Sequence, residues 1–323
     1  MVMAIRIHET GGPEVLRWEA VEVGRPGPGE ARVRHTAVGL NFIDVYHRSG
    51  LYALPLPAVP GSEAAGVVEE IGPGVTEVKA GDRVAYAGVV GAYSQVRLVR
   101  ADRLVPLPDD IKDGPAAAMM LKGMTAQYLL RRTCPVQRGD IVLIHAAAGG
   151  VGLIACQWAK HLGATVIGTV STDEKAALAR GHGCDHPIVT SRESFVSRVK
   201  EITGGRGVRV VYDSVGKDTF DGSLDCLQPM GMMVSYGNSS GPVAPISPLV
   251  LSAKGSLFLT RPTLMAYTAR REDLLATAAE LFEMVRSGAV RVEIRRTYPL
   301  AEAAQAHRDL EARRTTGSSL LLP

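Results

Sequence analysis

Residues 141–152, IVLIHAAAGGVG, constrain the fold of this chain more than any other segment. The apolar run Ile141–His145 has the length of a buried strand, and a glycine-rich turn follows it. From Gly150 to Leu162, apolar residues recur at helical spacing. A strand, a glycine-rich turn and an amphipathic helix in this order predict the first βαβ unit of a doubly wound parallel sheet.

The turn has the chemistry of a nucleotide-phosphate site. It matches G-x-G-x-x-G except that Ala147 replaces the first glycine. Gly149 lets the backbone approach a pyrophosphate, and Gly152 permits close packing of the helix on the strand. The helix N-terminus adds unpaired N–H groups. We therefore expect a bound dinucleotide, and the alternative is a tight turn without a ligand.

The end of the second expected strand, Thr165–Val170, indicates which dinucleotide binds. An NAD site places a carboxylate there for the ribose 2′-hydroxyl, but this chain has Val170 and Ser171. The segment Ser171-Thr-Asp-Glu174 fits a capping box, in which the two acids favour the first helical turn. Lys175 lies within reach of a 2′-phosphate if this helix starts at Ser171, although a lysine taken alone is more often a solvated surface residue. The missing acid and the nearby lysine favour NADPH.

The pattern of secondary structure changes near Lys122. Short alternating runs broken by turns come first and predict a β-barrel or sandwich. From Lys122 to Thr260, apolar runs alternate with amphipathic stretches, which predicts a parallel sheet. We expect helices at about 265–287 and 301–312. The expected strands outside 141–170 are Met3–Ile7, Ala31–Val38, Ala65–Ile71, Arg83–Ala87, Ser94–Val99, Val208–Tyr212, Met232–Tyr236 and Leu320–Leu322.

Composition excludes several classes of protein. No apolar run approaches the roughly 20 residues that span a bilayer, and no secretory signal is recognisable, so we expect a cytoplasmic protein. A net charge of +3 without a block of like charges does not indicate nucleic-acid binding. His182, Cys184 and His186 form one local cluster, but three ligands fall short of a structural zinc site, so we expect no bound metal. The scattered cysteines predict no disulfide framework; they are Cys134, Cys156, Cys184 and Cys226.

Segments along the whole chain resemble the zinc-independent quinone oxidoreductases of the medium-chain dehydrogenase/reductase superfamily, the zeta-crystallin-like group. They are GLNFIDVYHRSGLY (39–52), PGSEAAGVVEEIG (60–72), AGDRVAY (80–86), LKGMTAQYLL (121–130), HAAAGGVG (145–152), VVYDSVG (210–216), YGNSSG (236–241), TRP (260–262) and GSSLL (317–321). The resemblance implies an α/β fold with a GroES-like β-barrel catalytic domain over residues 1–122. It also implies a Rossmann domain over 123–260 and a return to the catalytic domain over 261–323.

The resemblance also implies roles for particular residues. Zinc-dependent relatives have a cysteine at about Asn41 and a Gly-His-Glu motif where this chain has Gly61-Ser62-Glu63, so alcohol oxidation of the zinc type is not expected. Asn41, Tyr46 and Tyr52 are implied to line the nicotinamide and substrate site, although tyrosines and asparagines also serve as ordinary half-buried or turn residues. Relatives have an aromatic residue near the position of Thr190, so the threonine of this chain departs from the family pattern. Cofactor contacts are implied for Asn41, Thr125, Ala148, Gly149, Gly150, Val151, Gly152, Ser171, Thr172, Lys175, Gly237, Asn238 and Ser240.

These features predict an NADPH-dependent reductase that transfers reducing equivalents to a quinone without a metal. The alternatives are an NADPH-dependent enone or enoyl-thioester reductase, which needs a positioned acid, and a non-catalytic NADPH-binding sensor. An RNA-binding role is disfavoured, because aromatic residues make up only 5% of the chain and form no stacking cluster. Related enzymes pair through the nucleotide domain, so we expect a homodimer or higher homo-oligomer.

Overall fold

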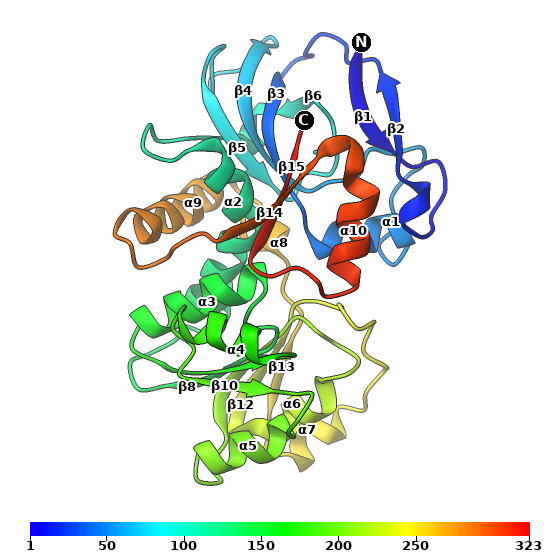
Figure 1. Cartoon of the computed structure of the whole chain (residues 1–323). Helices are drawn as coiled ribbons and strands as arrows, with labels where there is room; N and C mark the ends of the chain where they lie inside the picture. Colours follow the sequence, from blue (N-terminus) through cyan, green and yellow to red (C-terminus); the bar gives the residue numbers. More distant parts are fainter. The chain divides into compact units, whose positions relative to one another are not determined.

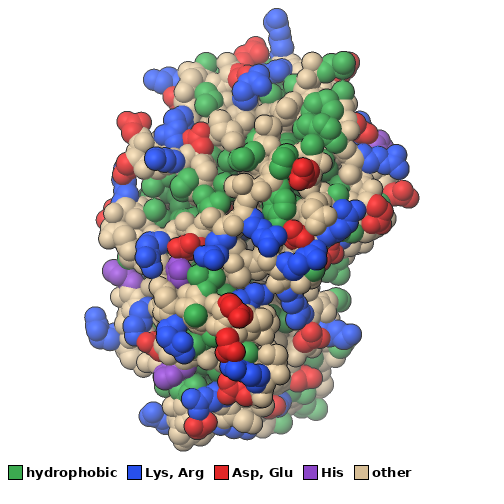
Figure 2. Space-filling view, viewed as in Figure 1, with side chains coloured by type: hydrophobic (Ala, Val, Ile, Leu, Met, Phe, Trp, Pro, Cys, Tyr) green, Lys and Arg blue, Asp and Glu red, His purple; other side chains and the backbone are tan.

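The computed structural model describes all residues, 1–323, and divides into two compact units (Figure 1). Unit 1 comprises Met1–Met124, Thr268–Phe282 and Val292–Pro323. Unit 2 comprises Thr125–Tyr267 and Glu283–Arg291. No helix is both long enough and apolar enough to cross a membrane. Positive and negative side chains are interspersed over the face shown in Figure 2.

A mostly antiparallel sheet forms the core of unit 1. Its strand order is β14-β15-β3-β4-β5-β7, with β6 also paired to β3, and β1 and β2 form a separate antiparallel pair. The strands are β1 (Val2–Arg6), β2 (Arg17–Val21), β3 (Glu30–Gly39), β4 (Glu63–Ile71), β5 (Arg83–Ala87), β6 (Val96–Arg100), β7 (Val105–Pro106), β14 (Ile294–Pro299) and β15 (Ser318–Leu322). The helices that start in this unit are α1 (Phe42–Ser49), α2 (Asp113–Tyr128), α9 (Arg271–Arg286) and α10 (Ala303–Glu311).

The C-terminal strand completes this sheet. Leu320 and Leu321 of β15 pair antiparallel with Gly39 and Val38 of β3, about 280 residues earlier in the chain (Figure 1). Leu321 is buried in the core with the inward-facing residues of β3 and β4, and Leu320 is also buried. The apolar run at the C-terminus is therefore a structural strand of unit 1.

Unit 2 is a six-stranded parallel sheet in the order β10-β9-β8-β11-β12-β13. Figure 1 shows α3 and α4 on one face and α5, α6 and α7 on the other. The strands are β8 (Ile141–Ile144), β9 (Thr165–Val170), β10 (His186–Val189), β11 (Val208–Asp213), β12 (Leu227–Ser235) and β13 (Phe258–Thr260). The helices are α3 (Gly150–His161), α4 (Asp173–Arg180), α5 (Phe195–Ile202), α6 (Phe220–Cys226), α7 (Leu249–Ala253) and α8 (Leu264–Tyr267). The predicted GroES-like and doubly wound α/β architecture is confirmed.

Two local predictions are wrong. The expected helix at 265–287 is broken into α8 and α9, and the break at Tyr267–Thr268 coincides with the boundary between the two units. The expected capping box from Ser171 starts one residue later, because the Thr172 hydroxyl accepts from the Lys175 N–H at 3.3 Å and α4 begins at Asp173. Lys175 is thus in the first turn of α4, close to the end of β9.

Candidate active site

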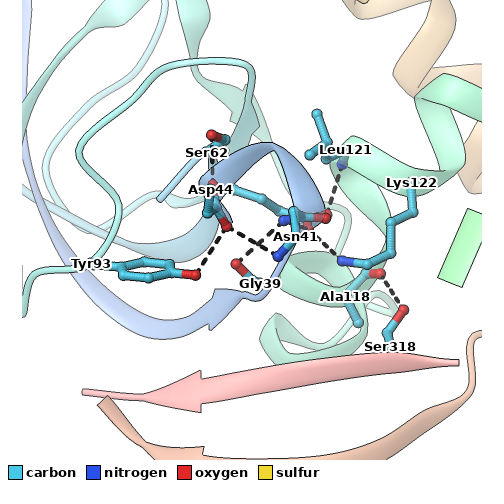
Figure 3. A network of polar contacts seen from close by, with 10 residues as sticks. Gly39, Asn41, Asp44, Ser62, Tyr93, Ala118, Leu121, Lys122 and Ser318 are labelled. Atoms are coloured by element: carbon cyan, nitrogen blue, oxygen red, sulfur yellow. Dashed lines mark hydrogen bonds and ion pairs between the residues drawn. The ribbon is translucent and has the colours of Figure 1, made fainter. Parts of the chain in front are cut away.

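Asn41 is the N-cap of helix α1, and its side chain is fixed by other buried groups of unit 1 (Figure 3). The amide Nδ2 donates to Glu63 Oε2 at 2.9 Å and to the Gly39 carbonyl at 3.3 Å. The backbone N–H of Asn41 donates to Asp44 Oδ2 at 3.0 Å. Both amide N–H groups are therefore occupied, and Asn41 serves to position the start of α1.

Glu63 holds a buried positive charge beside Asn41 (Figure 3). Its side chain is 0% exposed and accepts from Lys122 Nζ at 2.8 Å and from the Leu121 N–H at 2.7 Å. The Lys122 side chain is only 7% exposed. Glu63 ends the segment Gly61-Ser62-Glu63. An ammonium group at this carboxylate repels a metal cation, so the chain uses an ion pair here.

A second buried network includes Asp44 in the first turn of α1 and Arg48 in its last turn. Asp44 accepts from the Ser62 hydroxyl at 2.8 Å and from the Tyr93 hydroxyl at 3.0 Å (Figure 3). His307 Nε2 lies 3.0 Å from the Tyr93 hydroxyl, and the Arg48 guanidinium donates to His307 Nδ1 at 3.2 Å. Because a guanidinium only donates, His307 is neutral and carries its proton on Nε2. Burial raises the pKa of Asp44 to about 7, and burial with Arg48 lowers the pKa of His307 to about 3.

Tyr46 and Tyr52, the predicted substrate residues, lie together at the end of α1. Their ring centroids are 5.1 Å apart in an edge-on arrangement, and the Tyr52 N–H donates to the Tyr46 carbonyl at 3.0 Å. Tyr46 is buried and Tyr52 is half-buried. The His47 ring packs edge-on against Tyr52 at 6.0 Å, and its Nδ1 is buried without a hydrogen-bond partner. Burial lowers the pKa of His47, so a neutral imidazole lies beside the tyrosine pair.

The glycine-rich turn of unit 2 has the close contacts that the sequence predicts. A Cβ on Gly152 would lie 2.3 Å from the Ala146 carbonyl oxygen, and one on Gly149 would lie 3.2 Å from it. Gly149 caps α3 without a side-chain bond, so the N–H groups of the first turn, at Gly150, Val151 and Gly152, have no partner within the helix. This cradle suits the pyrophosphate of a dinucleotide.

The substitution at the first glycine of this motif is accommodated by its surroundings. The positive φ of the turn, 52°, falls on Ala146, so Ala147 does not need the conformational freedom of glycine. The Ala147 methyl occupies space that Gly168 of β9 leaves open, because a Cβ on Gly168 would lie 2.6 Å from it. Ala148 is buried in the same turn.

The predicted cofactor residues Gly237, Asn238 and Ser240 lie in a loop at the carboxyl ends of β11 and β12. The Ser240 hydroxyl donates to the Val215 carbonyl at 2.9 Å, and a Cβ on Gly237 would lie 2.4 Å from the Ser214 carbonyl. In the orientation that satisfies its whole amide, Asn238 donates to the Gly237 carbonyl at 2.9 Å and accepts from the Arg261 guanidinium at 3.0 Å. Ser240 therefore holds the loop together, and Arg261 orients Asn238.

The remaining predicted residues are Thr125 and the cluster of His182, Cys184 and His186, and the side chains of Thr125, His182 and Cys184 contact neighbouring protein groups. The Thr125 side chain is buried and hydrogen-bonds the Tyr128 hydroxyl, whose pKa is raised by burial. His182 Nδ1 lies 2.8 Å from the Leu178 carbonyl, and Cys184 is buried near the Val166 carbonyl. No three His, Cys, Asp or Glu side chains are grouped so that they could hold a metal ion.

Comparison with known proteins places this geometry in a family. Residues 27–109 match the alcohol dehydrogenase GroES-like domain, and residues 150–283 match the zinc-binding dehydrogenase family. The chain is 55% identical to the quinone oxidoreductase of Pseudomonas aeruginosa over 325 residues, covering 100% of both proteins. The chain belongs to the quinone oxidoreductase family of the medium-chain dehydrogenase/reductases.

Two further relatives have chemistry stated in their names. The Escherichia coli quinone oxidoreductase, solved in complex with NADPH, superposes with a TM-score of 0.98 at 51% identity, covering 99% of this chain and 100% of that one. The 2-haloacrylate reductase of a Burkholderia species is 53% identical over 332 residues, covering 100% of this chain and 99% of the relative. The names of these two relatives thus state oxidoreduction of a quinone and reduction of a 2-haloacrylate.

Sequence reasoning missed two charged side chains that the structure brings into these sites. The sequence patterns assign no role to Lys122, although an isolated lysine in an apolar helical stretch is a signal for a buried ion pair. No sequence pattern singles out Arg192, whose guanidinium pairs with Asp173 at the start of α4. That pairing requires β9 and β10 to be neighbouring strands, and the sequence around Arg192 does not predict this.

Proposed function

We propose that this protein is an NADPH-dependent quinone reductase that works without a metal. Its full-length similarity to quinone oxidoreductases, one of them solved with NADPH, carries the proposal. Unit 1, which holds most of residues 1–122 and 261–323, is the proposed catalytic domain, and unit 2, which holds most of residues 123–260, is the proposed nucleotide domain. We place the enzyme in the cytoplasm.

The residues of unit 2 fit the cofactor. The unpaired N–H groups at the start of α3 bind the pyrophosphate, and Gly149 and Gly152 leave room for its approach. Ser171, Thr172 and Lys175 lie at the end of β9, where the adenosine ribose of a dinucleotide binds. Thr125 and the 237–240 loop are assigned to the nicotinamide side. When bound, NADPH supplies the hydride.

Tyr46 and Tyr52 are assigned to the acceptor. A quinone delocalises negative charge, so the protein needs to orient the ring and to donate hydrogen bonds to its oxygens rather than to provide strong acid catalysis. The two edge-on rings offer an aromatic wall and two hydroxyl groups. Asn41 positions α1 beneath them, since its amide N–H groups are both engaged by Glu63 and Gly39.

Reduction of a conjugated acid is the second candidate function, and the 2-haloacrylate reductase relative favours it. That reaction needs a proton at carbon as well as a hydride, so a tyrosine hydroxyl has to act as an acid. An activity panel of 1,4-benzoquinone, 2-chloroacrylate and an enoyl thioester separates the two.

We further propose a homodimer formed through the free edge of the unit 2 sheet. Strand β13 is the edge strand, and Phe258 and Leu259 on it are 57% and 38% exposed. Met230 and Leu249, also in unit 2, are 71% and 76% exposed. Exposed apolar residues on an unpaired edge strand are typical of a surface that pairs with another chain. Sedimentation equilibrium of the wild type and of Phe258→Glu tests this proposal.

Oxidation of NADPH by the purified protein with a quinone panel is the deciding experiment. We expect turnover that prefers NADPH to NADH and is insensitive to chelators. Tyr46→Phe and Tyr52→Phe should each lower kcat, and the double variant should lower it further, while NADPH binding is unchanged. Tight NADPH binding without turnover of any acceptor would instead indicate a cofactor sensor.

A further inference from the structure

The turn after β10 is attached to the end of β9 by three hydrogen bonds. The Thr190 N–H and hydroxyl donate to the Val170 carbonyl at 2.9 and 3.1 Å, and the Ser191 hydroxyl donates to the Ser171 carbonyl at 3.1 Å. The Arg192 N–H closes the turn on the Val189 carbonyl at 3.0 Å. The Thr190 hydroxyl therefore helps to hold Arg192 beside the end of β9.

Arg192 forms a two-point ion pair with Asp173. Its two terminal nitrogens donate to the two carboxylate oxygens at 2.9 and 2.6 Å. The side chains are 61% and 66% exposed. An ion pair this exposed contributes little to folding stability, so its geometry is not explained by a need to hold unit 2 together. Both groups remain accessible to a ligand.

Asp173 carries a charge that disfavours NADPH. It is the first residue of α4, three positions after the end of β9, in the region where a carboxylate selects the ribose 2′-hydroxyl of NAD. A carboxylate there repels a 2′-phosphate. Arg192 cancels this charge, and a guanidinium has the planar donor geometry that binds phosphate oxygens. Lys175, in the same first turn, supplies a second cation.

We propose that the Asp173–Arg192 pair sets the cofactor preference of this protein, with Arg192 binding the 2′-phosphate while it neutralises Asp173. The inference rests on the proposed NADPH-dependent function and adds a specificity-determining residue to it. Without Arg192, the unpaired Asp173 carboxylate repels the phosphate and can accept a hydrogen bond from a ribose 2′-hydroxyl. The two residues therefore act in opposite directions on the same ligand group.

Calorimetric binding of two cofactor fragments tests this without any turnover. The compounds 2′,5′-ADP and 5′-AMP differ only in the 2′-phosphate. Arg192→Ala should weaken binding of 2′,5′-ADP by about 10- to 100-fold, the range for loss of charged hydrogen bonds, and should leave 5′-AMP binding unchanged or tighter. Asp173→Asn should tighten 2′,5′-ADP. The double variant should recover part of the loss, because the repulsion disappears with the carboxylate.

Arg198→Ala is the matched control, since Arg198 is an exposed arginine of unit 2 that pairs with Glu201 on α5. It removes the same charge and should leave both fragments' affinities within about twofold of wild type. Equal loss of both fragments in Arg192→Ala, or no loss of either, would overturn the inference. So would failure of Asp173→Asn to restore any binding in the double variant.

Failure of the inference and failure of the proposed function give different results. If the wild type discriminates between the fragments through Arg192 but reduces no quinone, the inference stands and the reductase function falls. If quinone turnover is rapid and NADPH-selective in both the wild type and Arg192→Ala, the reductase function stands and the inference falls.

Discussion

Replacing Lys122 by methionine is expected to destabilise unit 1 in a pH-dependent way. The Lys122 ammonium lies 2.8 Å from Glu63 Oε2, and both side chains are almost completely buried. Methionine keeps the length and apolar stem of lysine but removes the charge. Glu63 is then left with its bonds to Asn41 and to the Leu121 N–H and with no compensating cation. Breaking a buried ion pair in this way costs about 3–5 kcal/mol.

The cost has an upper limit, because the folded variant can take up a proton on the unpaired carboxyl group. Protonating an ordinary glutamate costs about 4 kcal/mol at pH 7 and about 1 kcal/mol at pH 5, from 1.36 kcal/mol per unit of pH above about 4.3. We therefore expect Lys122→Met to lose about 3–4 kcal/mol of unfolding free energy at pH 7 and about 1 kcal/mol at pH 5. The loss grows with pH because the unfolded chain releases this proton more readily than the folded one.

Urea unfolding followed by tryptophan fluorescence measures this loss. The chain has two tryptophans, Trp18 in unit 1 and Trp158 in unit 2, so a Trp158→Phe background leaves a probe of unit 1 alone. The double variant Lys122→Met with Glu63→Gln buries no charge and should lie within about 2 kcal/mol of wild type. A loss below about 1 kcal/mol at pH 7, or a loss that is the same at pH 5 and pH 7, would refute this reasoning.

The remaining predictions concern the glycine turn and the buried titrating groups. Gly152→Ala should weaken NADPH binding at least tenfold in a fluorescence titration, because its methyl would lie 2.3 Å from the Ala146 carbonyl and displace the phosphate-binding turn. Burial lowers the pKa of His35 to about 4 and of His307 to about 3, so the stability that these neutral rings contribute is lost as pH falls below about 6.5, by about 2 kcal/mol each at pH 5. The pKa of Asp44 is raised to about 7, so this carboxyl opposes that loss by about 2 kcal/mol over the same range. Denaturant titrations should accordingly show a loss near 1–2 kcal/mol between pH 7 and pH 5 in the wild type and near 4 kcal/mol in Asp44→Asn; equal slopes would contradict this assignment.

The parts of the fold with strong local signals could be predicted from the sequence. Strand β9 and the β8–α3 turn follow from apolar periodicity and glycine placement, and the structure confirms both. The break between α8 and α9 could not be predicted, because residues 265–287 keep a helical pattern throughout and the interruption arises where the chain passes between units. Helix propensity is a local property, and tertiary structure overrides it here.

The site residues also divide into those that local sequence predicts and those that only tertiary structure brings together. The sequence predicts Gly149 and Gly152 because their role depends on backbone geometry within eight residues of the end of β8. Arg192 acts through Asp173, nineteen positions away, and their contact exists only because β10 lies beside β9 and Thr190 fixes the intervening turn. The sequence explains Asp173 as an acidic residue that stabilises the first turn of α4. No local feature of the sequence indicates that an arginine neutralises its charge. A cofactor preference judged from the second strand alone therefore omits the cation that the third strand supplies.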